Sequence, residues 1–230
     1  MRLLVAALLA FALVACNDRE AERQAAKAHQ EAEKAHKDAV TTRLGPDVRK
    51  LLAKVDLLRP ALAGVPKAAE GAEPPSTEPR MKLSENDMKD PAGNTDLLFQ
   101  EELTLRQRGM LGTCGYYLQN PSSDDSADLL EDVLNRGLRT RYFLVVRADQ
   151  KKKPKITGGN SYSDGSLEGD VVVFDLASDP PKALGSFPLR SELTSTVKVS
   201  ANANQESIQY ALDEALRKTA LDEIEKLLKR

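Results

Sequence analysis

Residues 18–43 contain no glycine, no proline and no aromatic residue. Their alanines recur at alternating steps of four and three residues, the spacing of the a and d positions of a heptad repeat. The pattern predicts a long charged helix with a seam made of Ala21, Ala25, Ala28, Ala32, Ala35 and Ala39. The seam fits a coiled coil or a single helix in water, and we favour the single helix because alanine buries little apolar surface.

An apolar stretch at residues 3–14 precedes this helix, with Arg2 before it and Cys16 after it. Twelve helical residues extend about 18 Å, so they cannot cross a hydrocarbon core of roughly 30 Å. The stretch therefore reads as a cleaved targeting signal rather than a membrane span. Its end, Leu13-Val14-Ala15-Cys16, resembles the lipobox of bacterial lipoprotein signals at all four positions.

This resemblance implies that residues 1–15 are a signal peptide and that diacylglycerol is attached to the sulfur of Cys16. Two or three acyl chains give a stable membrane anchor, whereas one chain binds marginally. In lipoproteins of enteric bacteria, an aspartate directly after the lipidated cysteine favours the inner membrane. Here that position holds Asn17, which favours the outer membrane over the inner. We expect a protein held on the membrane by Cys16 and facing the periplasm.

Residues 16–59 are predicted to form a helical tether of two helices. Gly45-Pro46 is expected to end the first, because glycine often follows a helix and proline often opens one. An apolar stripe from Val48 to Leu58 predicts the second helix, which Pro60 should stop. Six prolines interrupt residues 60–93, which we interpret as a linker that contains a brief strand at residues 81–83.

The folded domain is predicted at residues 94–230, because most of the few aromatic residues lie after Phe99. Helical spacing of apolar residues favours a helix from Phe99 to Tyr117, with a strand at residues 97–99 as the alternative. Asp125 or Ser126 is expected to cap a short helix that ends at Leu138.

Four strands and a final helix are predicted to complete this domain. Beta-branched and aromatic runs predict strands at residues 142–147, 170–176, 183–189 and 194–200. A capping box of Asn202 and Gln205 should open a helix that runs to the end of the chain. The predicted fold class is α+β, with a small, mainly antiparallel sheet of about four strands and a long C-terminal helix.

The sequence offers few groups for catalysis or metal binding. Both histidines, His29 and His36, lie in the tether, where we expect them to be solvated. A Ser-His-Asp triad, a Cys-His dyad and histidine-bearing zinc sites are thus excluded from the domain unless the tether folds back onto it. Cys114 has no partner in the chain if Cys16 carries lipid, and we expect it to be buried.

Two charged segments remain as candidate sites. Asp164, Glu168 and Asp170 lie close in sequence but miss the spacing of an EF-hand calcium loop, so we favour a glycine-rich turn. Residues 151–155 carry four lysines, which fit either a solvated loop or a surface facing anionic lipid.

These features predict a non-catalytic adaptor, assembly factor or binding module of the cell envelope, with no cofactor and no metal. Its expected partners are the membrane, through Cys16, and an envelope protein; a net charge of -2 does not favour nucleic acid. The alternatives are an enzyme that uses Asp164, Glu168 and Asp170, and a module that binds a small apolar ligand.

Overall fold

The computed structural model describes residues 2–83, 93–103, 109–120, 125–158, 161–193 and 204–229. Helices and a four-stranded sheet form in this part of the chain, which confirms the α+β class. In chain order the elements are α1 (Arg2–Asp56), α2 (Leu58–Leu62), β1 (Thr95–Phe99), η1 (Gln100–Glu102), α3 (Gly109–Gln119), α4 (Ala127–Leu138), β2 (Tyr142–Lys152), β3 (Ile156–Gly158), β4 (Ser161–Tyr162), β5 (Gly165–Asp175), β6 (Lys182–Leu193) and α5 (Gln205–Leu228).

The main sheet has the strand order β1-β2-β5-β6. β1 runs parallel to β2, and the β2–β5 and β5–β6 pairs are antiparallel, so the sheet is mainly antiparallel as predicted. The short β3–β4 pair lies in the connection between β2 and β5. β2 and β5 contain unbroken apolar runs because both faces of the sheet are covered where they lie.

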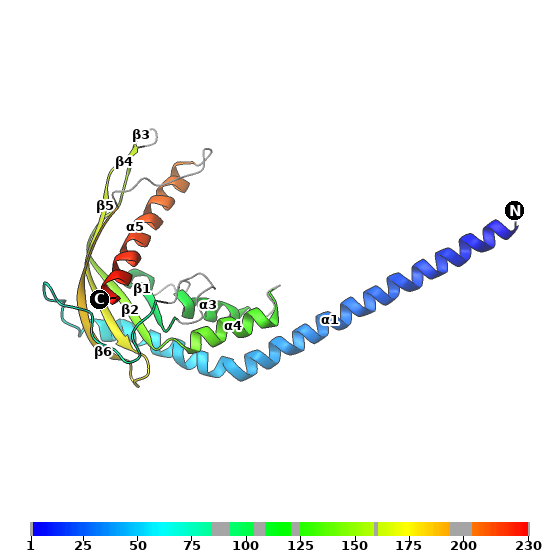
Figure 1. Cartoon of the computed structure of the whole chain (residues 1–230), viewed down its shortest axis with the longest axis horizontal. Helices are drawn as coiled ribbons and strands as arrows, with labels where there is room; N and C mark the ends of the chain where they lie inside the picture. The colour runs from blue at the N-terminus through cyan, green and yellow to red at the C-terminus, as the bar shows by residue number, and fades with distance from the viewer. Residues whose placement is uncertain are drawn as a thin grey trace.

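Helices cover the two faces of the sheet differently (Figure 1). α5 packs alone against one face, where Leu212 and Ile224 join the core that contains Leu144. The end of α1 and all of α2 pack against the other face, where Val55 and Leu58 meet Phe143. The central strands are therefore buried between two helical layers.

A third apolar cluster joins α1 to α3 and α4, beside the sheet. Val40 and Val48 of α1 are 2% and 0% exposed, and they pack with Cys114 of α3 and with Leu130 and Leu134 of α4. This cluster connects the predicted tether to the predicted domain through side chains that exclude water.

The prediction that a helix ends at Gly45-Pro46 is wrong, because α1 continues through both residues to Asp56. The structure gives Gly45 a different role: a Cβ atom there would lie 3.3 Å from Leu118 Cδ2. Glycine thus permits a close approach of α3 instead of stopping the helix. Packing on both sides of Pro46 compensates for the hydrogen bond that proline cannot donate. Pro60 likewise lies inside α2 and does not end the helical region.

The second half of the chain confirms several predictions and corrects two. Strands are found where three of the four beta-branched runs lie, and Ser126 caps α4 by accepting a hydrogen bond from Leu129 N–H. The helix predicted from Phe99 begins only at Gly109, and the alternative strand is the observed one. The cap of α5 is Asn204, whose side chain accepts from Ser207 N–H. The strand predicted at residues 194–200 lies outside the described residues.

The described part of the proline-rich segment, up to residue 83, lies along the sheet. The Arg147 guanidinium donates to the carbonyl oxygens of Val65 and Pro66 at 2.7 and 2.9 Å. Met81 is 6% exposed and belongs to the core beneath α5, and Leu83 forms a single bridge with Thr95. The core therefore includes side chains that precede residue 94.

Candidate functional site

The contact between α1 and α4 joins the predicted tether to the folded part. Glu33 Oε1 accepts a hydrogen bond of 2.5 Å from the backbone N–H of Ala127, the first residue of α4. Arg43 Nη2 lies 2.6 Å from Glu131 Oε1, and His36 Nε2 lies 3.9 Å from Glu131 Oε2. Because an acidic side chain at a helix N-terminus is favourable, Glu33 holds α4 in place from outside it.

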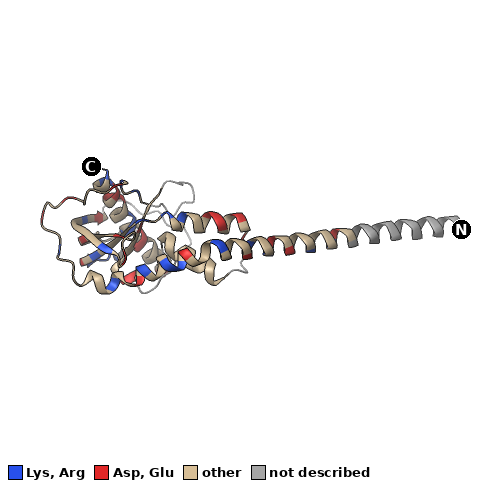
Figure 2. Ribbon diagram, turned by 90° about the horizontal axis from the view of Figure 1, so that it is seen from below, with Lys and Arg blue, Asp and Glu red and all other residues tan. Residues whose placement is uncertain are grey.

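The part of α1 before this contact extends away from the other elements (Figure 1). All six seam alanines, residues 21–39, are exposed. His29 and His36 are exposed as well, which confirms that they are solvated. Figure 2 shows acidic and basic residues mixed along the described part of this helix, as the sequence predicts.

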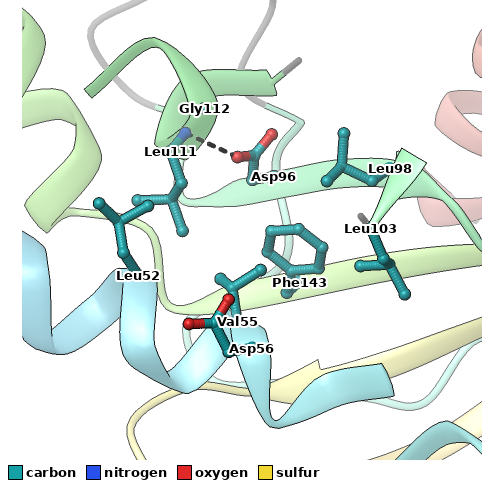
Figure 3. A pocket seen from close by; sticks show the side chains of 9 residues that line it. All are labelled: Leu52, Val55, Asp56, Asp96, Leu98, Leu103, Leu111, Gly112 and Phe143. Carbon is teal, nitrogen blue, oxygen red and sulfur yellow. Dashed lines mark hydrogen bonds between the residues drawn. The ribbon is translucent and has the colours of Figure 1, made fainter. Parts of the chain in front are cut away.

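One small cavity lies where α1, β1, β2 and α3 meet (Figure 3). Its volume of about 20 Å³ is close to that of one water molecule. The lining is mostly apolar, and the carboxylates of Asp56 and Asp96 are also present: Leu52, Val55, Asp56, Asp96, Leu98, Leu103, Leu111, Gly112 and Phe143. A cavity of this size does not hold a substrate or an apolar ligand in the described conformation.

Asp96 is the buried carboxylate at this cavity, and sequence reasoning missed it. Its oxygens accept hydrogen bonds from the backbone N–H groups of Met110 and Leu111, at 3.1 and 2.9 Å, so it caps α3 from the neighbouring strand. Burial raises the pKa of Asp96, and the backbone N–H donors oppose that rise. Gly109 precedes these donors with φ +77, and a Cβ atom there would lie 2.5 Å from the carboxylate. The arrangement is a structural cap.

The structure does not gather the three predicted carboxylates into one site. Asp164 and Glu168 are exposed on and near β5. Asp170 is buried, forms an ion pair with Arg147 and accepts a hydrogen bond of 2.9 Å from Ala68 N–H. Asp170 therefore fixes the proline-rich segment to the sheet and is separated in environment from the exposed Asp164 and Glu168. No group of three or more metal-ligating side chains occurs within the described ranges.

Cys114 is completely buried in α3, as predicted. Its Sγ donates to the carbonyl oxygen of Val133 at 3.3 Å, and burial raises the pKa of the thiol to about 12. Since the thiolate is the reactive form, Cys114 acts as a small apolar core residue rather than a nucleophile.

The lysines of residues 151–155 lie near the end of the molecule opposite the N-terminus (Figure 1). Lys151 pairs with Glu101 at 2.6 Å, and Lys153 lies 3.4 Å from Asp213. These carboxylates partly neutralise the segment, which weakens the alternative of a lipid-binding surface. The loop prediction is corrected in part, because Lys151 and Lys152 belong to β2 and the loop begins only at Lys153.

Comparisons with family models, with curated proteins and with solved structures each found no match. Among the described residues, no helix is both long and apolar enough to cross a membrane.

Proposed function

We propose that this protein is a lipid-anchored component of the cell envelope, which holds a non-catalytic adaptor or binding domain at a distance from the bilayer. One observation carries the proposal: α1 is a single helix that contains Cys16 and also enters the core at Val40. An acyl anchor on Cys16 would thereby connect to the folded part without an intervening loop.

The geometry of α1 sets the distance between the bilayer and the domain. Cys16 and Val40 are 24 residues apart, about 36 Å along a helix. The exposed charges of residues 21–39 keep this part of the helix in water, and a stable anchor needs the two or three acyl chains that the signal implies. The lipoprotein signal implies that the domain faces the periplasm, and Asn17 after the anchor favours the outer membrane over the inner.

The folded part supports a binding role more than the two alternatives. An enzyme that uses carboxylates needs acidic groups in one cleft, whereas Asp170 is bound by Arg147. A module for a small apolar ligand needs a larger cavity than the water-sized one beside Asp96. The outer surface of the domain remains for contact with an envelope protein.

Membrane fractionation of Cys16→Ser tests the anchor. We expect the variant to leave the membrane fraction or to remain as an unprocessed precursor, because serine cannot carry the thioether-linked lipid. Cys114→Ser is the matched control, since it removes the other cysteine and should leave the protein in the membrane fraction. A mature-sized Cys16→Ser protein that still sediments with membranes in high salt would refute the proposal.

A further inference from the structure

The charged residues that flank the alanine seam of α1 indicate which helix could pair with it. With the alanines at a and d, the e positions hold Glu22, His29, His36 and Arg43, and the g positions hold Gln24, Glu31 and Asp38. Residues at e and g face the neighbouring helix in a coiled coil, where they set the choice of partner and the orientation. From residue 24 onward, the acidic residues of these two flanks are thus all at g, and Arg43 is at e together with His29 and His36.

We propose that residues 21–43 of α1 form a parallel, in-register coiled coil with the same segment of a second copy of this chain. In such a pair, each g residue faces the e residue five positions later in the other helix. Glu31 then faces His36 of the second copy, and Asp38 faces Arg43 of the second copy. Symmetry doubles both contacts, which gives two ion pairs between Asp38 and Arg43 and two polar contacts between Glu31 and His36.

The same charges disfavour the antiparallel arrangement. There, g positions face g positions, so Glu31 and Asp38 would meet acidic residues of the second copy. The proposed lipid anchor adds an independent reason for a parallel pair, because two Cys16 anchors in one leaflet bring both helices to the membrane from the same end. This second reason rests on the proposed function, whereas the charge pattern does not.

The folded part leaves room for a second helix beside α1. α4 contacts α1 through Glu33 and Val40, which are b positions, and Glu131 of α4 lies near His36 and Arg43, which are e positions, while the seam alanines at a and d stay exposed. The side chains of His36 and Arg43 remain 47% and 59% exposed although both lie near Glu131. They therefore stay accessible to a helix that approaches along the seam.

Alanine contributes little to the affinity of this pair. It permits a close approach of two helices but buries little surface, so the paired charges supply orientation and part of the stability. Confinement to one membrane raises the effective concentration of two anchored copies, which makes a weak contact sufficient.

Disulfide cross-linking of the full chain in native membranes tests the proposal. Ala32→Cys places a thiol at an a position, where two copies of residue 32 would meet, and Gln30→Cys places one at the opposite f position as the matched control. We expect oxidation to convert Ala32→Cys, but not Gln30→Cys, to a product of twice the chain mass. Cross-linking of both, of neither, or to a product of another mass would overturn the proposal.

Charge reversals test the register. Glu31→Lys with Asp38→Lys, placed in the Ala32→Cys chain, should lower the association about tenfold, because the two Asp38–Arg43 ion pairs are lost and each new lysine at position 38 faces Arg43 of the other helix. Lys27→Glu with Lys34→Glu is the control, because these c positions lie away from the seam and should leave the cross-linking unchanged. Equal losses in both, or no loss in the first, would overturn the register, after circular dichroism confirms helicity. If the proposal of a lipid anchor is wrong, the fractionation of Cys16→Ser will show it. The cross-linking pattern does not depend on the anchor, so purified chains that also carry Cys16→Ser should keep that pattern at high protein concentration.

Discussion

The two halves of α1 share a helix but not an environment. Residues 21–39 are mostly exposed around an alanine seam, whereas Val40, Val48 and Val55 are buried against α3, α4 and the sheet. Both halves carry apolar residues at helical spacing, so periodicity does not distinguish them. The size of the apolar side chain does, because burying a valine contributes about 1.5 kcal/mol or more and burying an alanine much less.

Because of this difference, only the exposed half of α1 fits the predicted tether. The buried half of α1 supplies side chains to two of the three apolar clusters, so it is part of the folded core. The exposed half continues the same helix without a loop, and its direction is therefore set by the packing of the buried half. A membrane anchor on the first half would orient the domain as well as hold it.

Val48→Asp should have the largest effect of the changes that test this contrast. Val48 is 0% exposed, and an unpaired carboxylate there should cost about 4 kcal/mol of the free energy of unfolding. Ala26→Glu introduces the same charge into the exposed half, away from the seam, and should change that free energy by less than about 0.5 kcal/mol. Urea denaturation followed by circular dichroism measures both. Similar losses for the two variants would contradict the division of α1 into exposed and buried halves.

Pro46→Ala tests the continuity of the helix between the halves. A proline inside a helix costs about 3 kcal/mol, and its loss also adds freedom to the unfolded chain, worth up to about 1 kcal/mol. We expect a net stabilisation of about 2 kcal/mol, visible as a higher melting temperature. Pro60→Ala is the comparison variant, because Pro60 is exposed and lies in the short helix α2 instead of the long helix α1. An unchanged melting temperature for Pro46→Ala would indicate that Pro46 opens a separate helix, as the sequence suggests.

The strands were predictable because their signals are local. The apolar runs in β2 and β5 are short, beta-branched and bounded by turn residues, and no other element fits them. The helix predicted from Phe99 to Tyr117 is wrong because the helical spacing of apolar residues continues from the end of β1 into α3, which are separate elements in the fold. The helix end predicted at Gly45 is wrong because the sequence does not distinguish a glycine at a close contact between helices from a glycine that follows a helix end.

The polar contacts within the core depend on tertiary structure and were mostly unpredictable. Asp96 caps a helix that begins 13 residues later, beyond the reach of any capping motif read from sequence. The Arg147–Asp170 pair is an exception, since the two residues are opposite each other in the β2–β5 register. Aligning the two predicted strands as a hairpin would have found it and would have removed Asp170 from the candidate catalytic residues.

Glu33→Ala should have the smallest effect and tests the boundary between the halves. The Glu33 carboxylate accepts from the first N–H of α4, and its removal leaves that donor without this partner and takes a negative charge from the helix N-terminus. We expect a loss of about 1 kcal/mol in the free energy of unfolding. Glu22→Ala removes an acidic residue from the exposed half and should have no measurable effect, since α1 has no described neighbour there. Hydrogen exchange of the α4 amides gives the sharper measurement: faster exchange in Glu33→Ala alone would place the boundary at Glu33, and equal exchange in both variants would move it to the apolar contact at Val40.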